Sequence, residues 1–141
     1  MLRLWHYTYL QGPQALALLF VRIVVGSAFL FHGWPKIQHP FSWMGPDSPV
    51  PGLLQALAGA SEFLGGLAIL AGAFTCIAAL AIAAVMLGAL LLVHWPKGDP
   101  FIGHGSSWEL PAVYLALMGL LLFVGAGTYS LDAWLLEKPK T

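Results

Sequence analysis

Apolar residues along this chain fall into four long runs, and polar residues gather between them. A helix needs about 20 mostly apolar residues to cross a bilayer, and four stretches have about this length: residues 14–34, 53–74, 75–95 and 109–127. The second and third runs meet without a loop, which predicts a tight helical hairpin. The sequence therefore predicts an all-α fold, an integral membrane four-helix bundle that forms a single domain over residues 1–141 and ends in a short interfacial segment at residues 130–137.

The composition agrees with lipid as the solvent of most of the chain. Hydrophobic residues make up 59% of the sequence and charged residues 9%, whereas a soluble domain carries about 25% charged residues. The formal net charge is zero, so nucleic acid is not an expected partner. Cys76 is the single cysteine, which excludes an internal disulfide and a CxxC redox pair. We interpret it as a small apolar packing residue.

An even number of spans places both termini on one side of the membrane. We name this side the A face, and the opposite side, which carries loops 35–52 and 96–108, the B face. Lys and Arg are enriched on the cytoplasmic side of membrane proteins. The A face carries three such residues and the B face two: Arg3, Lys138 and Lys140 against Lys36 and Lys97. This pattern predicts cytoplasmic termini.

Two opposite charges lie inside apolar runs, where a charge is costly and usually has a partner. Arg22 lies ten residues before His32, about 15 Å from the B end of the first run. Glu62 lies nine residues after Leu53, about 13–14 Å from the same end. The matching depths predict an Arg22–Glu62 ion pair near the middle of the membrane. Such a pair either fixes helix register or handles a proton or an anion.

Glycines share the helix faces that carry these two charges. At 100° per residue, Gly26 and Gly33 fall on the side of Arg22, and Gly65, Gly66 and Gly72 on the side of Glu62. Because glycine lets helix backbones approach closely in lipid, we expect these faces to pack against each other.

A second group of ionisable residues gathers near the B face: His32, Lys36, His94 and Glu109, from three different runs. Together with Arg22 and Glu62 below them, they are candidates for a ligand site or a proton relay. A plainer interpretation is that they are interfacial groups satisfied by water and backbone.

Three other interpretations stay open for this group. A quinone or another small ligand fits a pocket between bundle helices with a few polar groups, because histidine can hydrogen-bond a quinone oxygen and exchange its proton near neutral pH. His32 and His94 are the weaker candidates for two ligands of haem b or of a metal ion. Alternatively, the protein is a non-catalytic accessory subunit that docks onto a larger membrane complex, or it associates with itself through its small residues.

One ordered set of residues runs through all four apolar stretches and the tail: Arg22, Gly26, Phe29, His32, Gly33, Lys36, Glu62, Gly65, Gly66, Gly72, Phe74, Thr75, His94, Glu109, Gly125, Gly127, Ser130, Leu131 and Asp132. In this set the chain resembles the DoxX family of small four-helix bacterial membrane proteins, within a wider group that includes DoxD and MauE-like proteins. The resemblance covers about 110 residues in order, and one departure is Cys76, where relatives commonly have Arg.

The resemblance implies the four-helix fold, the inner-membrane location and cytoplasmic termini. Because some relatives are linked to thiosulfate oxidation with quinone as acceptor and others to thiol or oxidative-stress systems, it also implies an association with membrane redox or quinone-linked metabolism. The sequence contains no nucleophile–base pair, phosphate loop or dinucleotide fingerprint. Any enzymatic role is therefore expected as a subunit of a quinone-linked oxidoreductase.

Overall fold

The computed structural model describes residues 9–136, and every regular element in this part of the chain is helical. Arg3, Lys138, Lys140 and the last residue of the predicted segment 130–137 lie outside the described residues. The elements are α1 (Gly12–Gln38), α2 (Gly52–Ala71), α3 (Thr75–Gly88), the π-helical η1 (Ala89–His94), α4 (Trp95–Lys97), α5 (Glu109–Val124) and α6 (Leu131–Leu136).

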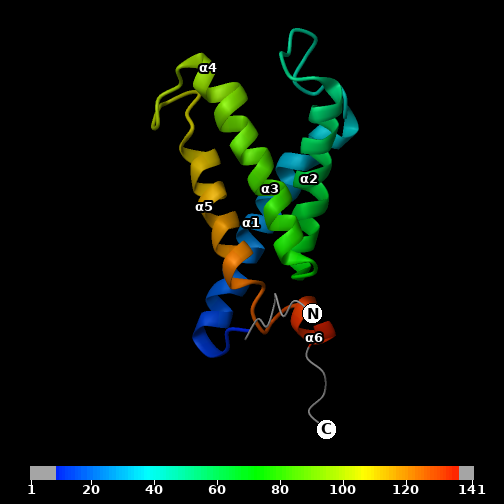
Figure 1. The fold of residues 1–141 in the computed structure, drawn as a ribbon, viewed down its shortest axis with the longest axis vertical. Coiled ribbons are helices and arrows are strands. Elements are labelled where there is room, and N and C mark those ends of the chain that lie inside the picture. Colours follow the sequence, from blue (N-terminus) through cyan, green and yellow to red (C-terminus); the bar gives the residue numbers. More distant parts are fainter. Residues whose placement is uncertain (1–8, 137–141) are drawn as a thin grey trace, which may run out of the picture.

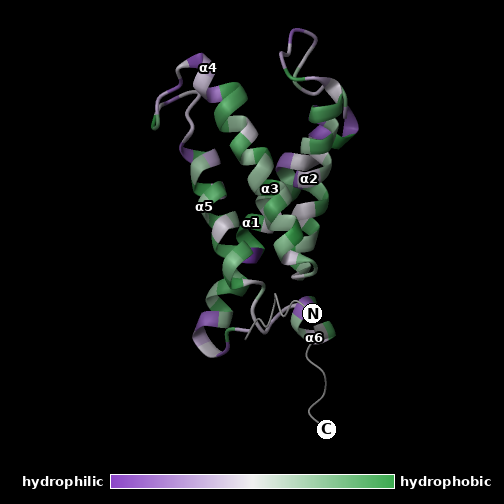
Figure 2. Cartoon of the chain, viewed as in Figure 1, coloured by the Kyte–Doolittle hydropathy of each residue, from purple (hydrophilic) through white to green (hydrophobic). Residues whose placement is uncertain are grey.

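Three helical stretches are long and apolar enough to cross a membrane. They are Gly12–Gln38, Gly52–Ala71 and the continuous run Thr75–Lys97, while Glu109–Val124 is a shorter apolar helix of about 24 Å. Figure 2 shows hydrophobic residues over these helices and hydrophilic ones mainly in the connecting loops and near α6. The predicted all-α membrane bundle is confirmed.

The helices pack in chain order, α1 on α2, α2 on α3 and α3 on α5. The rings of Phe29 and Tyr114, whose centroids are 4.8 Å apart, bring α1 to α5. The Thr128 hydroxyl donates to the Leu10 carbonyl at 2.6 Å, so the two described ends of the chain meet at the A face. Figure 1 shows α2 and α3 leaving their tight turn at this end and diverging toward the B face.

Close approach of α1 and α2 depends on glycine, as the sequence predicts. A Cβ atom on Gly33 would lie 2.5 Å from the Phe63 backbone nitrogen, and one on Gly26 would lie 2.9 Å from the Gly66 carbonyl oxygen. Gly65 instead faces α3, where a Cβ would meet Ile82 at 2.9 Å. Neighbouring glycines of α2 therefore serve two different helix contacts.

Several helix bounds differ from the predicted ones by a few residues, and backbone chemistry explains two of these differences. α1 does not end at Trp34 but continues through Pro35 to Gln38; proline inside membrane helices is tolerated where neighbouring groups compensate for the lost hydrogen bond. α2 ends at Ala71, three residues earlier than predicted, because Gly72 adopts a left-handed conformation with φ 65°.

The third helix contains a feature that periodicity did not predict, the wide turn η1 at Ala89–His94. Pro96 lies two residues after its end, inside α4. Proline has no N–H, and its ring crowds the carbonyl four residues earlier, here that of Leu92. The wider π turn accommodates this proline without breaking the helix.

The α1–α2 contact can be tested with one methyl group. Gly33→Ala inserts a Cβ against the α2 backbone, and overpacking of this kind costs about 1–3 kcal/mol. We expect the free energy of unfolding, measured by titration with SDS, to fall by this amount. Gly119→Ala on α5 is the matched control, because a Cβ there meets nothing within 4 Å. Equal stability of the two variants would contradict the close contact.

Candidate functional site

Arg22 is buried at the A end of the bundle, where its guanidinium binds four backbone carbonyls. Nε donates to Ile69 at 2.9 Å and Nη2 to Leu70 at 2.9 Å, both at the end of α2. Nη1 donates to Ala126 at 2.9 Å and to Tyr129 at 2.6 Å, in the segment after α5. The residue is 1% exposed. Arg22 therefore joins the ends of two helices that are distant in sequence.

The predicted Arg22–Glu62 ion pair is wrong, because both oxygens of Glu62 bind Lys36 instead. The error comes from the end of α1. Counted from the true end at Gln38, Arg22 lies sixteen residues, or about 24 Å, below the B end. Glu62 lies ten residues, or about 15 Å, from the start of α2 at Gly52. The two charges are thus at different depths, and Arg22 does not lie directly below the ionisable residues of the B face.

Asp132 completes the A-end arrangement. Its carboxylate accepts from the backbone N–H groups of Phe74 at 2.7 Å and Thr75 at 3.0 Å, and so caps the start of α3. Its charge also stabilises Arg22 electrostatically. Ser130 caps α6 through a 3.1 Å bond from the Ala133 N–H. The tail is therefore bound to the α2–α3 turn.

Lys36 and Glu62 form an ion pair in the half of the bundle nearer the B face. The Lys36 Nζ lies 2.6 Å from each carboxylate oxygen, and the exposed fractions of the two side chains are 20% and 2%. The same Nζ lies 4.5 Å from the centroid of the Trp43 ring. Pairing compensates for the cost of burying Glu62, and an aromatic face lies directly beside the cation.

This ion pair lies on the wall of a cavity of about 480 Å³, which we name the α2–α3 cavity. Small residues from both helices leave the space, chiefly Ala58 and Ser61 on one side and Ala81, Ala84 and Gly88 on the other. Three further lining residues, Leu54, Leu57 and Leu92, are about half exposed on the surface of the chain. The cavity is thus mostly apolar, with one charged pair on its wall.

The loop after α1 is fixed over the α2–α3 cavity by the buried amide of Gln55. The Gln55 Oε1 accepts from the Met44 N–H at 3.0 Å, and Nε2 donates to the Val50 carbonyl at 2.8 Å. The Trp43 indole donates to the Gln55 carbonyl at 2.9 Å. Trp43, Met44 and Val50 all line the cavity. The proline-rich loop therefore contributes walls to it.

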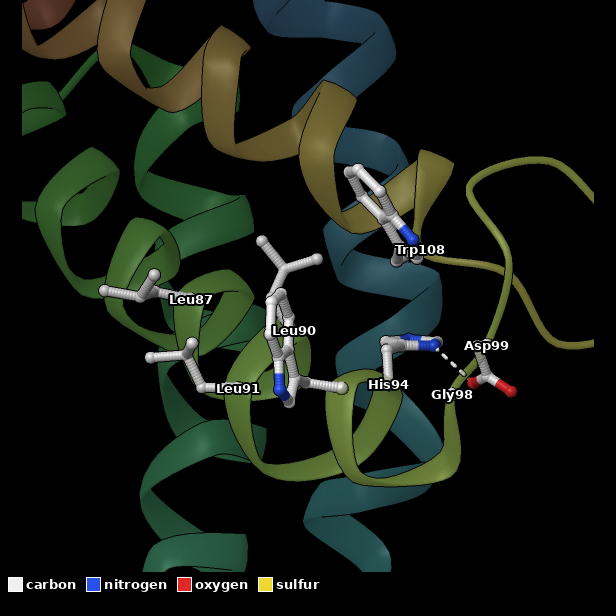
Figure 3. A pocket seen from close by; sticks show the side chains of 8 residues that line it. Leu87, Leu90, Leu91, His94, Gly98, Asp99 and Trp108 are labelled. Carbon is white, nitrogen blue, oxygen red and sulfur yellow. Dashed lines mark hydrogen bonds and ion pairs between the residues drawn. The ribbon is translucent and has the colours of Figure 1, made fainter.

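A second cavity, of about 430 Å³, lies beside His94, and we name it the His94 cavity. It is lined by Leu87, Leu90, Leu91, His94, Trp95, Gly98, Asp99 and Trp108. Figure 3 shows the His94 imidazole directed toward Asp99, with Leu90 on one side and Trp108 beyond. The Nδ1 atom lies 2.8 Å from Asp99 Oδ2, which also accepts from the Ser106 hydroxyl at 2.6 Å. The Ser106 hydrogen bond, with a smaller contribution from His94, lowers the pKa of the Asp99 carboxyl.

The predicted B-face group is only partly brought together. Lys36 meets Glu62, but His94 meets Asp99 instead of another candidate. His32 is exposed and packs near Phe29 and Tyr114, with ring centroids 6.4 and 6.2 Å away. Within residues 9–136, no hydrogen bond or ion pair joins His32, His94 and Glu109, and neither cavity is lined by both histidines.

Four residues that shape these sites were not among the candidate site residues predicted from the sequence: Trp43, Gln55, Asp99 and Asp132. Gln55 had a usable signal, because it is an amide one turn into an apolar helix and such a group needs partners when buried. The bonds of Asp99 and Asp132 depend on how loops and tail fold back, which spacing does not encode.

These features define an integral membrane helical bundle with charged residues satisfied inside it. The chain belongs to the DoxX family, whose model matches residues 17–95. The match covers the first three spans and includes Arg22, Lys36, Glu62 and His94. Glu109 and Asp132 lie beyond it.

Two relatives extend the comparison past the matched region. The chain is 33% identical over 117 residues to an uncharacterised protein of Haemophilus influenzae, covering 82% of this chain and 87% of the relative. It is 29% identical over 136 residues to an uncharacterised membrane protein of Mycobacterium tuberculosis, covering 86% and 82%. No solved structure matches the chain.

The role of Arg22 predicts a strong loss of stability on truncation. Arg22→Met leaves four carbonyls without their donor, and each unsatisfied buried group costs about 1–3 kcal/mol. We expect the free energy of unfolding in SDS to fall by at least about 3 kcal/mol.

A double-mutant cycle separates this arrangement from the rejected ion pair. Coupling between Arg22→Lys and Glu62→Gln should lie within about 0.5 kcal/mol of zero, whereas coupling between Lys36→Met and Glu62→Gln should exceed about 1 kcal/mol. A larger coupling energy for Arg22 with Glu62 than for Lys36 with Glu62 would show that the Arg22–Glu62 ion pair is present.

Proposed function

We propose that this DoxX-family protein binds a membrane-dissolved amphiphile in the α2–α3 cavity, and that the ligand is of the isoprenoid quinone class. The observation that carries the proposal is the position of the Lys36–Glu62 pair on the wall of a largely apolar cavity of about 480 Å³. Ligand pockets are commonly apolar with a few convergent polar groups that orient the ligand.

The polar end of the cavity suits a flat head that accepts hydrogen bonds. A lysine ammonium has three donors, and the two oxygens of Glu62 occupy two directions from Lys36. A third N–H is left to donate to a ligand carbonyl. The Trp43 ring, 4.5 Å from the same nitrogen, offers a face against which a ring can pack. A quinone has both features, a carbonyl acceptor and a planar ring.

The rest of the cavity suits an apolar tail that arrives through the bilayer. The lining on the third span runs from Ala81 to Val93, twelve residues or about 18 Å along the helix. Leu54, Leu57 and Leu92 line the cavity and are exposed on the chain surface, which faces lipid in a membrane. A lipid-soluble ligand can therefore enter from the side without crossing water.

The chemistry assigned to this chain is binding and orientation of the head. When bound, a quinone would supply two-electron redox chemistry, with electrons from a donor outside this chain. Lys36 holds the carbonyl end, and Glu62 keeps Lys36 charged and in place. Arg22, at the opposite end, takes no part in holding the ligand. The alternative role as an accessory subunit of an electron-transfer complex stays a prediction.

Ligand binding tests the proposal directly. In nanodiscs, a short-chain ubiquinone analogue should bind saturably and raise the midpoint of thermal unfolding. Lys36→Met removes the donor to the head, and hydrogen bonds from charged groups are worth about 1.5–3 kcal/mol. We therefore expect affinity to fall about tenfold or more. Lys97→Met is the matched control, because Lys97 also lies toward the B face but lines neither cavity.

Two further variants guard against simple misfolding. Lys36→Met/Glu62→Leu replaces the whole pair, which is often neutral for stability. Gly88→Leu fills the cavity from a position where a Cβ meets nothing within 4 Å. Both should fold and lose binding. Wild-type affinity in both variants would remove the α2–α3 cavity as the site.

We also propose that the termini are cytoplasmic. Lys36 is part of α1 and paired with Glu62, so it is not a free loop charge. The positive charges then favour the A face, with Arg3, Lys138 and Lys140 against Lys97.

Labelling of introduced cysteines tests this orientation. In bacterial cells expressing a Cys76→Ala background, a membrane-impermeant maleimide should label Asp47→Cys, in the exposed B-face loop, before lysis. Gln11→Cys, exposed at the A face, should be labelled only after permeabilisation. The opposite labelling pattern would show that the termini lie outside the cytoplasm.

A further inference from the structure

The His94 cavity is separate from the α2–α3 cavity, although one helix forms a wall of both. Leu90, Leu91 and His94 line the His94 cavity, whereas Ala89, Leu92 and Val93 line the other. All six residues lie in η1. The wide turn therefore directs His94 away from the Lys36–Glu62 pair, into a space with its own chemistry.

Asp99 determines which ring nitrogen of His94 carries a proton. Asp99 Oδ2 accepts from the Ser106 hydroxyl and contacts His94 Nδ1 at 2.8 Å. The Ser106 bond lowers the pKa of Asp99, so its carboxylate is ionised near neutral pH and can only accept hydrogen bonds. Nδ1 must then be the donor. In a neutral imidazole the other nitrogen, Nε2, is left as an acceptor.

Nε2 has no hydrogen-bond partner within residues 9–136, so the acceptor is available to a ligand. The rest of the cavity is apolar and aromatic, with Leu87, Trp95 and Trp108 among its lining. Figure 3 shows the leucines on the side of His94 opposite Asp99, with Leu90 the nearest of them, and Trp108 above the imidazole. Indole faces favour a flat ring, since offset or edge-to-face aromatic contacts are favourable.

From this combination we infer that the His94 cavity is a second binding site, which takes a small aromatic molecule carrying a hydroxyl group. The ligand hydroxyl donates to His94 Nε2, and its ring packs among Trp95, Trp108 and the leucines. Asp99 and Ser106 are positioning residues that hold the imidazole in the accepting tautomer. This site differs from the α2–α3 cavity in its required partner, because Lys36 selects a carbonyl acceptor and His94 selects a hydroxyl donor.

Two probes that differ by one hydrogen-bond donor test the inference. Binding of 4-fluorophenol and 4-fluoroanisole to the protein in nanodiscs is followed by fluorine NMR at about pH 8.5, where imidazole in water is neutral. The phenol should bind about three- to tenfold more tightly than the ether, the effect of one hydrogen bond. Empty nanodiscs measure how much of each probe partitions into the lipid, and this contribution is subtracted from the binding signal. Equal affinity for the two probes in the wild-type protein would overturn the site.

Variants identify the acceptor. His94→Phe keeps a ring but removes Nε2, and should abolish the preference for the phenol. His104→Phe is the matched control, since His104 lies in the loop that carries Asp99 and Ser106 but lines neither cavity, and it should keep the preference. Lys36→Met/Glu62→Leu should also keep it, which separates failure of this site from failure of the α2–α3 site. Loss of preference in either control, or its retention in His94→Phe, would overturn the assignment.

A tautomer measurement needs no variant that could misfold. Long-range nitrogen–hydrogen NMR of the wild-type protein should find the His94 proton on Nδ1. Asp99→Asn removes the ionised acceptor that fixes this tautomer, so the preference for the phenol should decrease toward onefold. A wild-type proton on Nε2 would overturn the mechanism.

Discussion

Backbone carbonyls inside a membrane must find donors within the protein, and the fold depends on how the A end meets this requirement. Two helices stop there: α2 at Ala71, and α5 at Val124, before the buried segment Gly125–Gly127. α5 is too short to cross a full hydrocarbon core, and irregular backbone completes its path. Arg22 donates hydrogen bonds to backbone carbonyls at the end of α2 and in the segment that follows α5. A charged side chain is stable in this position because four carbonyl dipoles and Asp132 replace its hydration.

The opposite end of the bundle follows from this fixed end. Because the α2–α3 turn is held by Arg22 and Asp132, α2 and α3 start close together and diverge toward the B face (Figure 1). The residues on their facing sides are small, so their side chains do not fill the space between the diverging helices. The Lys36–Glu62 pair and the loop bound by Gln55 close the wide end. The α2–α3 cavity therefore results from two features: the turn between the helices is fixed at the A face, and the side chains between them toward the B face are small.

The sequence was sufficient for the helices, for their membrane environment and for the glycine contacts of α1 with α2. These depend on local composition and periodicity, which a single sequence carries. It was not sufficient for the pairing of charges. The depth of Arg22 was counted from His32, but α1 continues to Gln38. This placed Arg22 too near the B face, at the level of Glu62, whereas Lys36 lies close enough to Glu62 to pair with it. The hydrogen bonds of Gln55 and Asp132 depend on loop and tail paths, which no local pattern specifies.

The π turn η1 forms part of the wall of both cavities. Its residues alternate between the cavity walls, with His94 on one side and Ala89 and Val93 on the other. A turn of helix moves as a unit because its backbone hydrogen bonds connect successive residues, so a displacement that widens one cavity changes the wall of the other. Pro96, two residues after the turn, has no backbone N–H to donate to it. In the binding proposed at His94, the ligand would therefore contact the same helical turn that bounds the α2–α3 cavity, without any contact to Lys36 or Glu62.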